Sequence, residues 1–224
     1  MKYLNQFLKE KYILMLLVPF LTGIIFLIGS YGKGPAHLLV NGWNSPQADV
    51  FFKYVTHLGD GAVFALVILL LLFIRIRWAF YELFAALMTL IFVFIAKQII
   101  FKGIPRPTKY FEGTETLHLV EGVKMHALNS FPSGHTITAF AIFITLALIV
   151  KKSYLKMMFT ATAILAGFSR VYLSQHFLED VLSGALIGIA IALLSCSLVD
   201  KLSIFKTSWI DYNLLEIVSK KHEQ

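Results

Sequence analysis

The stretch Ser169-Arg-Val-Tyr-Leu-Ser-Gln-His-Phe-Leu-Glu-Asp180 joins two apolar runs, 153–173 and 177–199, and places charged groups between them. Arg170 precedes His176 by six residues, and Asp180 follows that histidine by four. A helix that begins near His176 would bring His176 and Asp180 onto one face, one turn apart. A carboxylate there holds the imidazole in one tautomer and leaves the other ring nitrogen as a nucleophile or base. Ionisable groups at the edge of apolar segments indicate a functional site.

The composition places the chain in a membrane. Of its 224 residues, 58% are hydrophobic and 15% are charged, whereas soluble domains carry about 25% charged residues. We expect an all-α fold of one domain, residues 1–224, with six transmembrane helices, short loops and a longer active-site loop, 102–133, between the third and fourth helices. A spanning helix needs about 20 apolar residues, and the stretches that qualify are 12–30, 58–75, 78–101, 134–150, 153–173 and 177–199.

The charge distribution predicts the orientation in the membrane. The net charge is +7, and the basic residues lie mostly in short loops between apolar runs, which favours membrane orientation over nucleic-acid binding. The loops near Arg75 and Lys151 are basic without acids, so we expect them, and the N-terminus, on the cytoplasmic side. The end of the third helix, the start of the fourth and the loop between the fifth and sixth then share the outer face. The unusual polar residues cluster at those three places, which predicts one composite site.

The first of the other two polar segments is Lys97 to Pro107. Lys97 lies near the outer end of the third predicted helix, and Arg106 lies between two prolines that keep the backbone extended. An arginine on so stiff a segment suits an oxyanion ligand. Taken alone, an interfacial lysine beside a turn would explain the segment as well.

The second segment, Phe131-Pro-Ser-Gly-His-Thr136, precedes the fourth apolar run. Ser133 is the predicted N-cap, and Gly134 allows a ligand to approach the backbone. A helix N-terminus presents free N–H groups to an anion, and His135 would lie beside that anion. The alternative is an ordinary capped helix with an interfacial histidine.

Together the three segments describe a cradle for a tetrahedral oxyanion such as phosphate. Neither an Asp/Glu cluster for magnesium nor a His-x-x-Glu-His pattern for zinc is present in the sequence, so we expect a metal-independent reaction without a cofactor. The cradle combines cations, a hydroxyl, backbone donors, two imidazoles and one carboxylate: Lys97, Arg106, Arg170, Ser133, Gly134, His135, His176 and Asp180.

These residues resemble the motifs of the type 2 phosphatidic acid phosphatase (PAP2) superfamily, which are Lys-x6-Arg-Pro, Pro-Ser-Gly-His and Ser-Arg-x5-His-x3-Asp. The second and third motifs match residue for residue, at Pro132 to His135 and at Ser169 to Asp180. The first motif departs from the family pattern, because eight residues separate Lys97 from Arg106. Lys102 is therefore an alternative to Lys97.

The resemblance implies a role for each matched position. His176 would attack phosphorus and form a phosphohistidine, Asp180 would orient and stabilise His176, and His135 would protonate the leaving oxygen. The equatorial phosphate oxygens would be held by Lys97, Arg106, Ser133, Gly134 and Arg170. Water would then hydrolyse the intermediate.

The expected function is a lipid phosphate phosphatase at the outer surface of a bacterial cytoplasmic membrane. Undecaprenyl diphosphate, phosphatidylglycerophosphate, phosphatidic acid and lipid A phosphate all fit as substrates, and the sequence favours none of them; nor does it indicate an oligomeric state. A lipid-to-lipid phosphotransferase would use the same residues. A protein resembling the vanadate-dependent haloperoxidases is a further alternative, against which the six apolar spans argue. A non-catalytic transporter or scaffold would need a vestigial site.

Several other features yield weaker expectations. Gly184 and Gly188 form a small-xxx-small pair that favours packing within the monomer. Glu179 lies about 100° around the helix from Asp180 and is expected to face elsewhere. The single cysteine, Cys196, is expected to be a small buried side chain. The tail after Asp200 is expected to be a short helix or disordered. The 102–133 loop carries His118, His126, Glu115 and Glu121, which either touch a lipid head group or are solvated.

Overall fold

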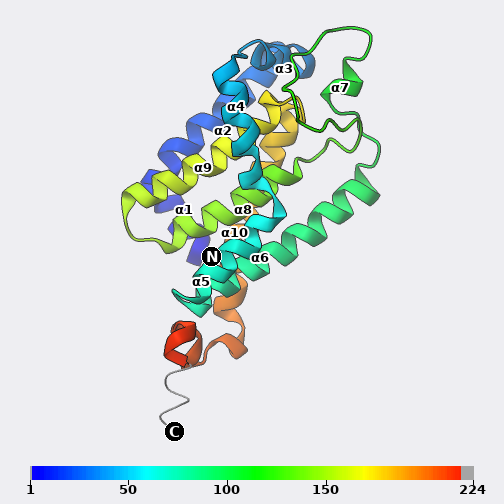
Figure 1. Ribbon diagram of the computed structural model, residues 1–224. Helices are drawn as coiled ribbons and strands as arrows, with labels where there is room; N and C mark the ends of the chain where they lie inside the picture. Colours follow the sequence, from blue (N-terminus) through cyan, green and yellow to red (C-terminus); the bar gives the residue numbers. More distant parts are fainter. Residues whose placement is uncertain (1, 218–224) are drawn as a thin grey trace.

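The computed structural model describes residues 2–217, and this part of the chain is helical apart from turns, loops and one isolated β-bridge between Pro105 and Leu128 (Figure 1). The predicted all-α class is confirmed. The tail after Asp200 is expected from the sequence to be a short helix or disordered. As far as Ile217 it forms short helical turns, and the rest of the tail lies outside the described residues. The helices are α1 (Lys2–Lys9), α2 (Lys11–Tyr31), α3 (Lys33–Asn41), α4 (Pro46–Val55), α5 (Gly61–Leu72), α6 (Ile76–Ile95), α7 (Pro107–Tyr110), α8 (Gly134–Ile149), α9 (Ser153–Tyr172) and α10 (Leu178–Lys201), with short 3-10 turns η1 (Thr56–Gly59), η3 (Ser203–Phe205) and η4 (Ser208–Asp211) and a π-helical turn η2 (Ala96–Ile100).

Each of the six predicted spans contains a helix, but the helices differ in their fitness to cross a membrane. By length and composition, α2, α6 with η2, and α10 are long and apolar enough, and α4–η1 with α5 would make a fourth span bent by 64°. The apolar helix α8 has only 16 residues. The second predicted span, 58–75, contains α5, whose regular helix begins at Gly61 after the chain bends near Gly59.

Helix α8 forms the centre of the bundle. It packs against α6, α9 and α10, and all its residues from Thr136 to Leu148 are buried. Close packing requires glycine at two positions on α10, since a Cβ on Gly184 would lie 2.9 Å from the Ser133 carbonyl oxygen and one on Gly188 would lie 2.6 Å from the Phe140 Cβ. The prediction that this pair packs within the monomer is confirmed.

The start of α10 differs from the sequence expectation. The helix begins at Leu178 with Phe177 as its N-cap, so His176 precedes the helix instead of opening it. The Asp180 carboxylate accepts a hydrogen bond from the Phe177 N–H at 3.0 Å. A carboxylate in the first turn of a helix satisfies a backbone donor that has no intrahelical acceptor, and this capping fixes Asp180 beside the histidine.

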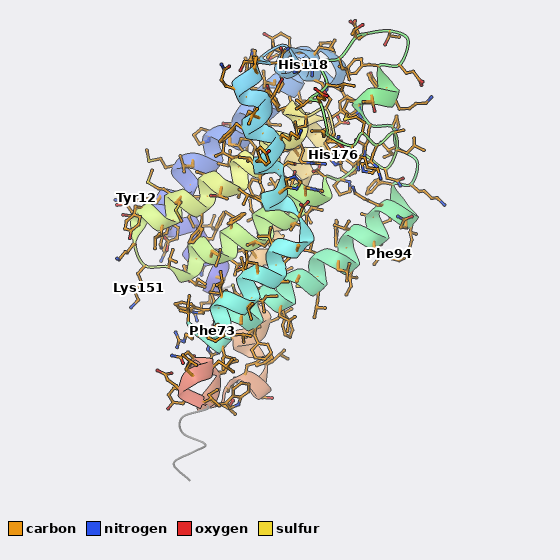
Figure 2. All side chains as sticks on the ribbon, viewed as in Figure 1. Tyr12, Phe73, Phe94, His118, Lys151 and His176 are labelled. Atoms are coloured by element: carbon orange, nitrogen blue, oxygen red, sulfur yellow. The ribbon has the colours of Figure 1, made fainter. Side chains whose placement is uncertain are left out.

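The connection 31–57 is helical and covers the end of the bundle that carries the predicted site. It forms α3 and α4. Side chains of these helices bind the loop before His176, because His37 Nε2 lies 3.2 Å from Ser174 Oγ and Asn41 donates to the same hydroxyl at 3.1 Å. Figure 2 places His118 and His176 toward this end and Lys151 and Phe73 toward the opposite end.

The opposite end is held by a cluster of ion pairs. Lys2 Nζ lies 2.8 Å from Asp200 Oδ2, and Arg77 Nε lies 2.7 Å from Asp211 Oδ1. Arg75 Nη2 lies 2.8 Å from the same Asp211 oxygen. We call these five residues the inner ion-pair cluster. Cys196 is buried nearby in an apolar cluster, as predicted.

Candidate active site

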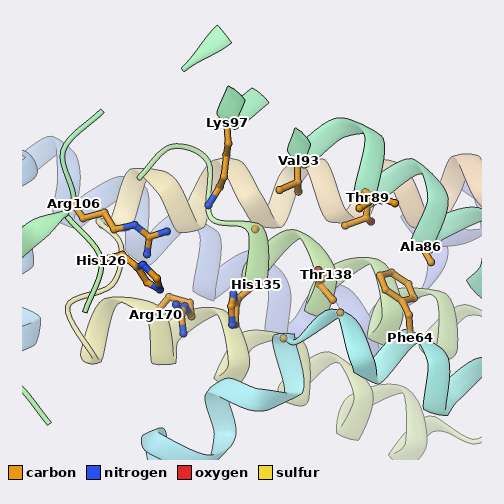
Figure 3. Close-up of a pocket in the computed structure, with 14 residues that line it drawn as sticks. Phe64, Ala86, Thr89, Val93, Lys97, Arg106, His126, His135, Thr138 and Arg170 are labelled. Atoms are coloured by element: carbon orange, nitrogen blue, oxygen red, sulfur yellow. The ribbon is translucent and has the colours of Figure 1, made fainter. Parts of the chain in front are cut away.

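A cavity of about 480 Å³ lies between α5, α6 and α8 (Figure 3). One end gathers Lys97, Arg106, His126, His135 and Arg170, while Phe64, Ala86 and Thr89 lie toward the other end. The site thus joins a cationic pocket to an apolar arm. The complete lining is Gly59, Gly61, Phe64, Ala86, Thr89, Leu90, Val93, Lys97, Arg106, His126, Gly134, His135, Thr138 and Arg170.

His176 and Asp180 form a buried pair behind the cavity. His176 Nδ1 lies 3.3 Å from Asp180 Oδ2, and the two side chains are 1% and 0% exposed. The ionised carboxylate only accepts hydrogen bonds, so Nδ1 carries the proton and Nε2 keeps its lone pair. Burial, followed by the charges of Arg106 and Arg170, holds the pKa of His176 well below its usual range. His176 is therefore neutral at ordinary pH, the form that can attack an electrophile.

Arg106 lines the cationic end of the cavity, and it is buried on a backbone that is extended at this residue, as predicted. It is the N-cap of α7, with φ −84° and ψ 167°. Its Nε donates to the Leu128 carbonyl at 2.9 Å, and its Nη1 lies 3.2 Å from both the backbone and the side-chain oxygen of Gln175. Burial lowers the pKa of Arg106, and Asp180 partly offsets this effect. All its partners are neutral.

Arg170 and Lys97 complete the cations of the cavity. Arg170 is 6% exposed and donates from Nη1 to the Thr56 hydroxyl at 2.5 Å, while its buried Nε has no hydrogen-bond partner among the described residues. Lys97 points toward the other cations in Figure 3. Lys102 is exposed and does not line the cavity, so the structure favours Lys97 as the first-motif lysine.

The backbone near Lys97 offers a physical account of the unusual spacing to Arg106. Lys97 lies in the π-helical turn η2, which holds an additional residue within one turn of helix. The chain then turns at Gly103, whose φ of +83° is readily adopted only by glycine. These two features take up residues between Lys97 and Arg106 while both side chains still reach the cavity.

The Pro-Ser-Gly-His segment begins α8 as predicted. Ser133 is the N-cap, and its Oγ accepts from the Thr136 N–H at 3.4 Å and from the Thr136 hydroxyl at 2.8 Å. The Ser133 N–H donates to the Asp180 carbonyl at 3.1 Å, so α8 and α10 begin side by side. A Cβ on Gly134 would lie 3.8 Å from Lys97 Nζ, which places this backbone directly against the cationic pocket. Its N–H has no intrahelical acceptor.

A fourth segment, residues 56–60, contacts two of the predicted site residues, and the sequence-based prediction did not include it. Asp60 Oδ1 lies 2.8 Å from His135 Nε2, and Asp60 Oδ2 lies 2.8 Å from His57 Nδ1. Thr56 of the same segment binds Arg170. The signal in the sequence was the polar run 56–60 at the outer start of the second apolar span.

Two further partners were also missed. Ser130 donates to Asp180 Oδ2 at 2.5 Å, and Gln175 links Arg106 to the long loop through the Lys124 carbonyl at 3.1 Å. Neither residue has a sequence pattern that separates it from an ordinary loop residue. Asp180 Oδ1 is buried without a hydrogen-bond partner in the described part of the chain.

The remaining candidates separate into two groups. His126 lines the cavity, and burial followed by the charge of Arg106 lowers its pKa. His118 instead pairs with Asp49 at 3.0 Å, outside the cavity. Glu179 forms an ion pair with Lys33 and does not line the cavity, which agrees with the prediction that it faces elsewhere.

The cavity is lined by two imidazoles and three cations, and the buried His176–Asp180 pair lies outside this lining. Donors fixed before a ligand arrives stabilise developing negative charge without reorganisation. Within residues 2–217, His, Cys, Asp and Glu side chains form no group of three that could hold a metal ion. The chemistry that the site supports is therefore binding of an oxyanion with nucleophilic attack upon it.

Two known bacterial proteins are similar in sequence to parts of this chain. Phosphatidylglycerophosphatase B of Bacillus subtilis (strain 168) is 34% identical over 86 residues, which cover 34% of this chain and 42% of that protein. The bacitracin transport permease protein BcrC of Bacillus licheniformis is 33% identical over 104 residues, 46% of this chain and 50% of that protein. The chain thus spans half or less of the length of these curated relatives.

A solved structure and a family model extend the similarity. The crystal structure of Aquifex aeolicus LpxE has a TM-score of 0.65 and 30% sequence identity, and the match covers 74% of this chain and 94% of that chain. The model of the PAP2 superfamily matches residues 78–204, which is more than half of the chain and includes Lys97, Arg106, His135, His176 and Asp180. The chain therefore belongs to the PAP2 superfamily.

Proposed function

We propose that this protein is a metal-independent lipid phosphate phosphatase that acts through a phosphohistidine intermediate. The observation that carries the proposal is the state of its cavity cations, Lys97, Arg106 and Arg170. No carboxylate of the described residues lies within ion-pair distance of any of them. Burying a charge without an opposite charge is costly, and a bound phosphate would supply the missing negative charge.

The geometry supports a two-step reaction. His176 Nε2 attacks phosphorus, and the bond from phosphorus to the leaving oxygen breaks as His135 gives that oxygen a proton. The Asp180 carboxylate stabilises the positive charge that develops on the His176 ring. A water molecule then gives a proton to His135 and attacks the phosphohistidine, which releases inorganic phosphate and restores His176.

The cations, the Ser133 segment and the Gly134 N–H bind the phosphate oxygens throughout these steps. Arginine presents donors in a planar fork that matches phosphate geometry. Removal of one such donor typically costs about 10²- to 10³-fold in rate, which sets the scale expected for each cradle residue.

The apolar arm of the cavity supports a lipid as the substrate. Phe64, Leu90 and Val93 line it beside the cationic end, so a phosphate can occupy the cationic pocket while a hydrocarbon chain extends between α5 and α6. The name of one bacterial relative, phosphatidylglycerophosphatase B, agrees with this substrate class. We place the site at the outer face of a bacterial cytoplasmic membrane, with six helices crossing it.

The direct test is phosphate release by the detergent-purified protein. The substrates would be phosphatidic acid, phosphatidylglycerophosphate, undecaprenyl diphosphate and lipid A phosphate, each with EDTA present. The proposal predicts EDTA-resistant release that is lost in His176→Ala. Release that EDTA abolishes would contradict the metal-independent site.

The same assay separates the phosphatase from a lipid-to-lipid phosphotransferase. Both activities form the same phosphohistidine, and they differ in whether water or a lipid hydroxyl attacks it. Transfer of labelled phosphate to an added lipid alcohol without release of inorganic phosphate would replace the proposed hydrolysis with phosphate transfer.

A further inference from the structure

The segment between α4 and α5 brings a carboxylate to the second imidazole of the site. Each carboxylate oxygen of Asp60 contacts a histidine: Oδ1 lies 2.8 Å from His135 Nε2, and Oδ2 lies 2.8 Å from His57 Nδ1. Among the described residues, Asp60 is the only carboxylate at hydrogen-bond distance from His135. His57 lies toward solvent, with its side chain 67% exposed, whereas Asp60 is 39% exposed.

Asp60 does not serve the usual purpose of an aspartate at its position. It is the N-cap of α5, where an aspartate side chain normally accepts a hydrogen bond from the first turn, yet its side chain caps no N–H of α5. The carboxylate is turned to the two imidazoles instead. Its position therefore reflects an interaction with His135 more than a requirement of α5.

The backbone holds this contact in place. A Cβ on Gly59 would lie 2.7 Å from the His135 carbonyl oxygen and 2.9 Å from the His135 Cβ, so only glycine permits η1 to lie this close to α8. Thr56, at the other end of η1, accepts the hydrogen bond from Arg170. Two separate contacts thus fix the segment that carries Asp60 against the catalytic pocket.

We infer that Asp60 is a positioning residue that orients His135 and stabilises its protonated form, with His57 holding the second carboxylate oxygen. The inference rests on the proposed phosphatase function, in which His135 is the general acid. His135 shares the cavity with Lys97 and Arg170, whose positive charges disfavour a protonated imidazole. Asp60 offsets that repulsion.

The contact also determines which nitrogen exchanges the proton. An ionised carboxylate accepts the Nε2–H of His135, so this hydrogen stays on Nε2. Nδ1 is then the nitrogen that gives its proton to the leaving oxygen, and that later takes a proton from the attacking water. Asp60 itself neither gains nor loses a proton in these steps.

This role predicts a dependence on the leaving group. An alkyl alcohol needs a proton to depart, whereas 4-nitrophenolate departs without one. In Asp60→Asn, kcat for a long-chain alkyl phosphate is expected to fall on the order of 10- to 100-fold, with 4-nitrophenyl phosphate affected by about 3-fold or less. His135→Gln is expected to show the same selectivity with a larger loss, and His57→Gln a smaller one.

Asp49→Asn is the matched control. Asp49 also pairs with a histidine, His118, at 3.0 Å on the neighbouring helix α4, but outside the cavity. It is expected to change both substrates equally and little. Equal losses on both substrates in Asp60→Asn, or no loss on either, would overturn the inference. Absence of His176-dependent hydrolysis in the wild type would instead overturn the proposed function.

A measurement without turnover tests the inference separately. In protein labelled with ¹⁵N-histidine, the His135 signals, assigned by their absence in His135→Gln, are expected to show a hydrogen on Nε2 in the wild type. In Asp60→Asn the two tautomers are expected to mix. An unchanged tautomer in Asp60→Asn would contradict the role of Asp60, even in a protein that retains its phosphatase activity.

Discussion

The cavity cations and the inner ion-pair cluster show two ways in which one helical bundle treats positive charge. In the inner cluster, Lys2, Arg75 and Arg77 contact Asp200 or Asp211 within 3.4 Å. Around the cavity, Arg106 and Arg170 are buried against carbonyls, an amide and a hydroxyl, and the described residues give Lys97 no carboxylate partner. The inner charges are paired with carboxylates, whereas the cavity charges have no carboxylate partner among the described residues.

This difference separates structural from functional charge. Two groups in an ion pair largely neutralise each other, so neither attracts a charged ligand strongly. In the inner cluster such pairs connect α6 with α10 and η4. Buried cations with neutral partners keep most of their field for an incoming group, since neutral acceptors cancel less charge than a carboxylate does. Substitution of a cavity cation should therefore lower activity with little effect on stability, whereas substitution in the inner ion-pair cluster should lower stability with little effect on activity.

The largest expected effect comes from the nucleophile. His176→Ala is expected to lose at least about 10³-fold in turnover, because no other side chain in the described structure can take its place opposite Asp180. The measurement is phosphate release with EDTA present, compared with His118→Ala, a histidine outside the cavity. Near-wild-type turnover in His176→Ala would exclude this residue as the nucleophile.

The next effect contrasts one arginine from each end. Arg170→Gln is expected to lower kcat/KM by about 10²- to 10³-fold with little loss of thermal stability, since it removes a buried charge that has no carboxylate partner. Arg77→Gln is expected to leave kcat/KM unchanged and to destabilise the protein by about 1 kcal/mol.

The same two variants can also be compared by thermal unfolding with and without orthovanadate, a phosphate analogue. The analogue is expected to stabilise the wild type and Arg77→Gln but not Arg170→Gln. The comparison between the two ends fails if Arg77→Gln loses as much activity as Arg170→Gln.

The two ends of the bundle are also expected to differ in how their stability depends on pH. Burial lowers the pKa of His37, which packs behind the site, from 6.5 to about 4. Below pH 6.5 the unfolded chain binds a proton here that the folded chain does not, so stability falls as the pH drops toward 4, by roughly 3 kcal/mol in total.

The variant His37→Phe tests this pH dependence. It is expected to flatten the acid side of a plot of thermal midpoint against pH. At the inner end, hydrogen bonding to Arg77 keeps the pKa of Asp211 below its usual range, so the pair persists to lower pH. An unchanged acid slope in His37→Phe would place the sensitive group elsewhere.

The smallest expected effect concerns the packing below the site. Gly188→Ala would bring a Cβ to 2.7 Å from the Ile137 carbonyl oxygen and is expected to destabilise the protein by about 2 kcal/mol. Gly23→Ala is the matched control, since its Cβ would meet nothing within 4 Å, and it is expected to be neutral or slightly stabilising. Equal stability of the two variants would contradict the close approach of α8 and α10.

Much of the site could be predicted because its motifs are local in sequence. The four-residue spacing predicted the contact of His176 with Asp180, although His176 precedes the helix, and the capping preference of serine predicted the start of α8 at Ser133. The alternation of apolar runs placed these segments on one face. These inferences need only neighbours along the chain and the period of a helix.

Other parts depend on contacts that the sequence does not encode locally. Asp60 lies 75 residues from His135, and its role follows from the absence of a Cβ at Gly59, which lets two backbones meet. The π-helical turn at Lys97 and the start of α10 after His176 are likewise set by packing and capping in three dimensions. Periodicity alone predicts a regular helix at both places.

The central claim is that the cavity cations hold a phosphate for attack by His176. The most direct measurement is rapid acid-free quenching of the purified protein with a ³²P-labelled lipid phosphate, followed by mass spectrometry of the peptide that carries His176. The account predicts a transient, acid-labile phosphate on His176 that accumulates in the wild type and is absent from His176→Ala. A protein that releases phosphate without labelling this histidine, or that carries the label on another residue, would contradict the account.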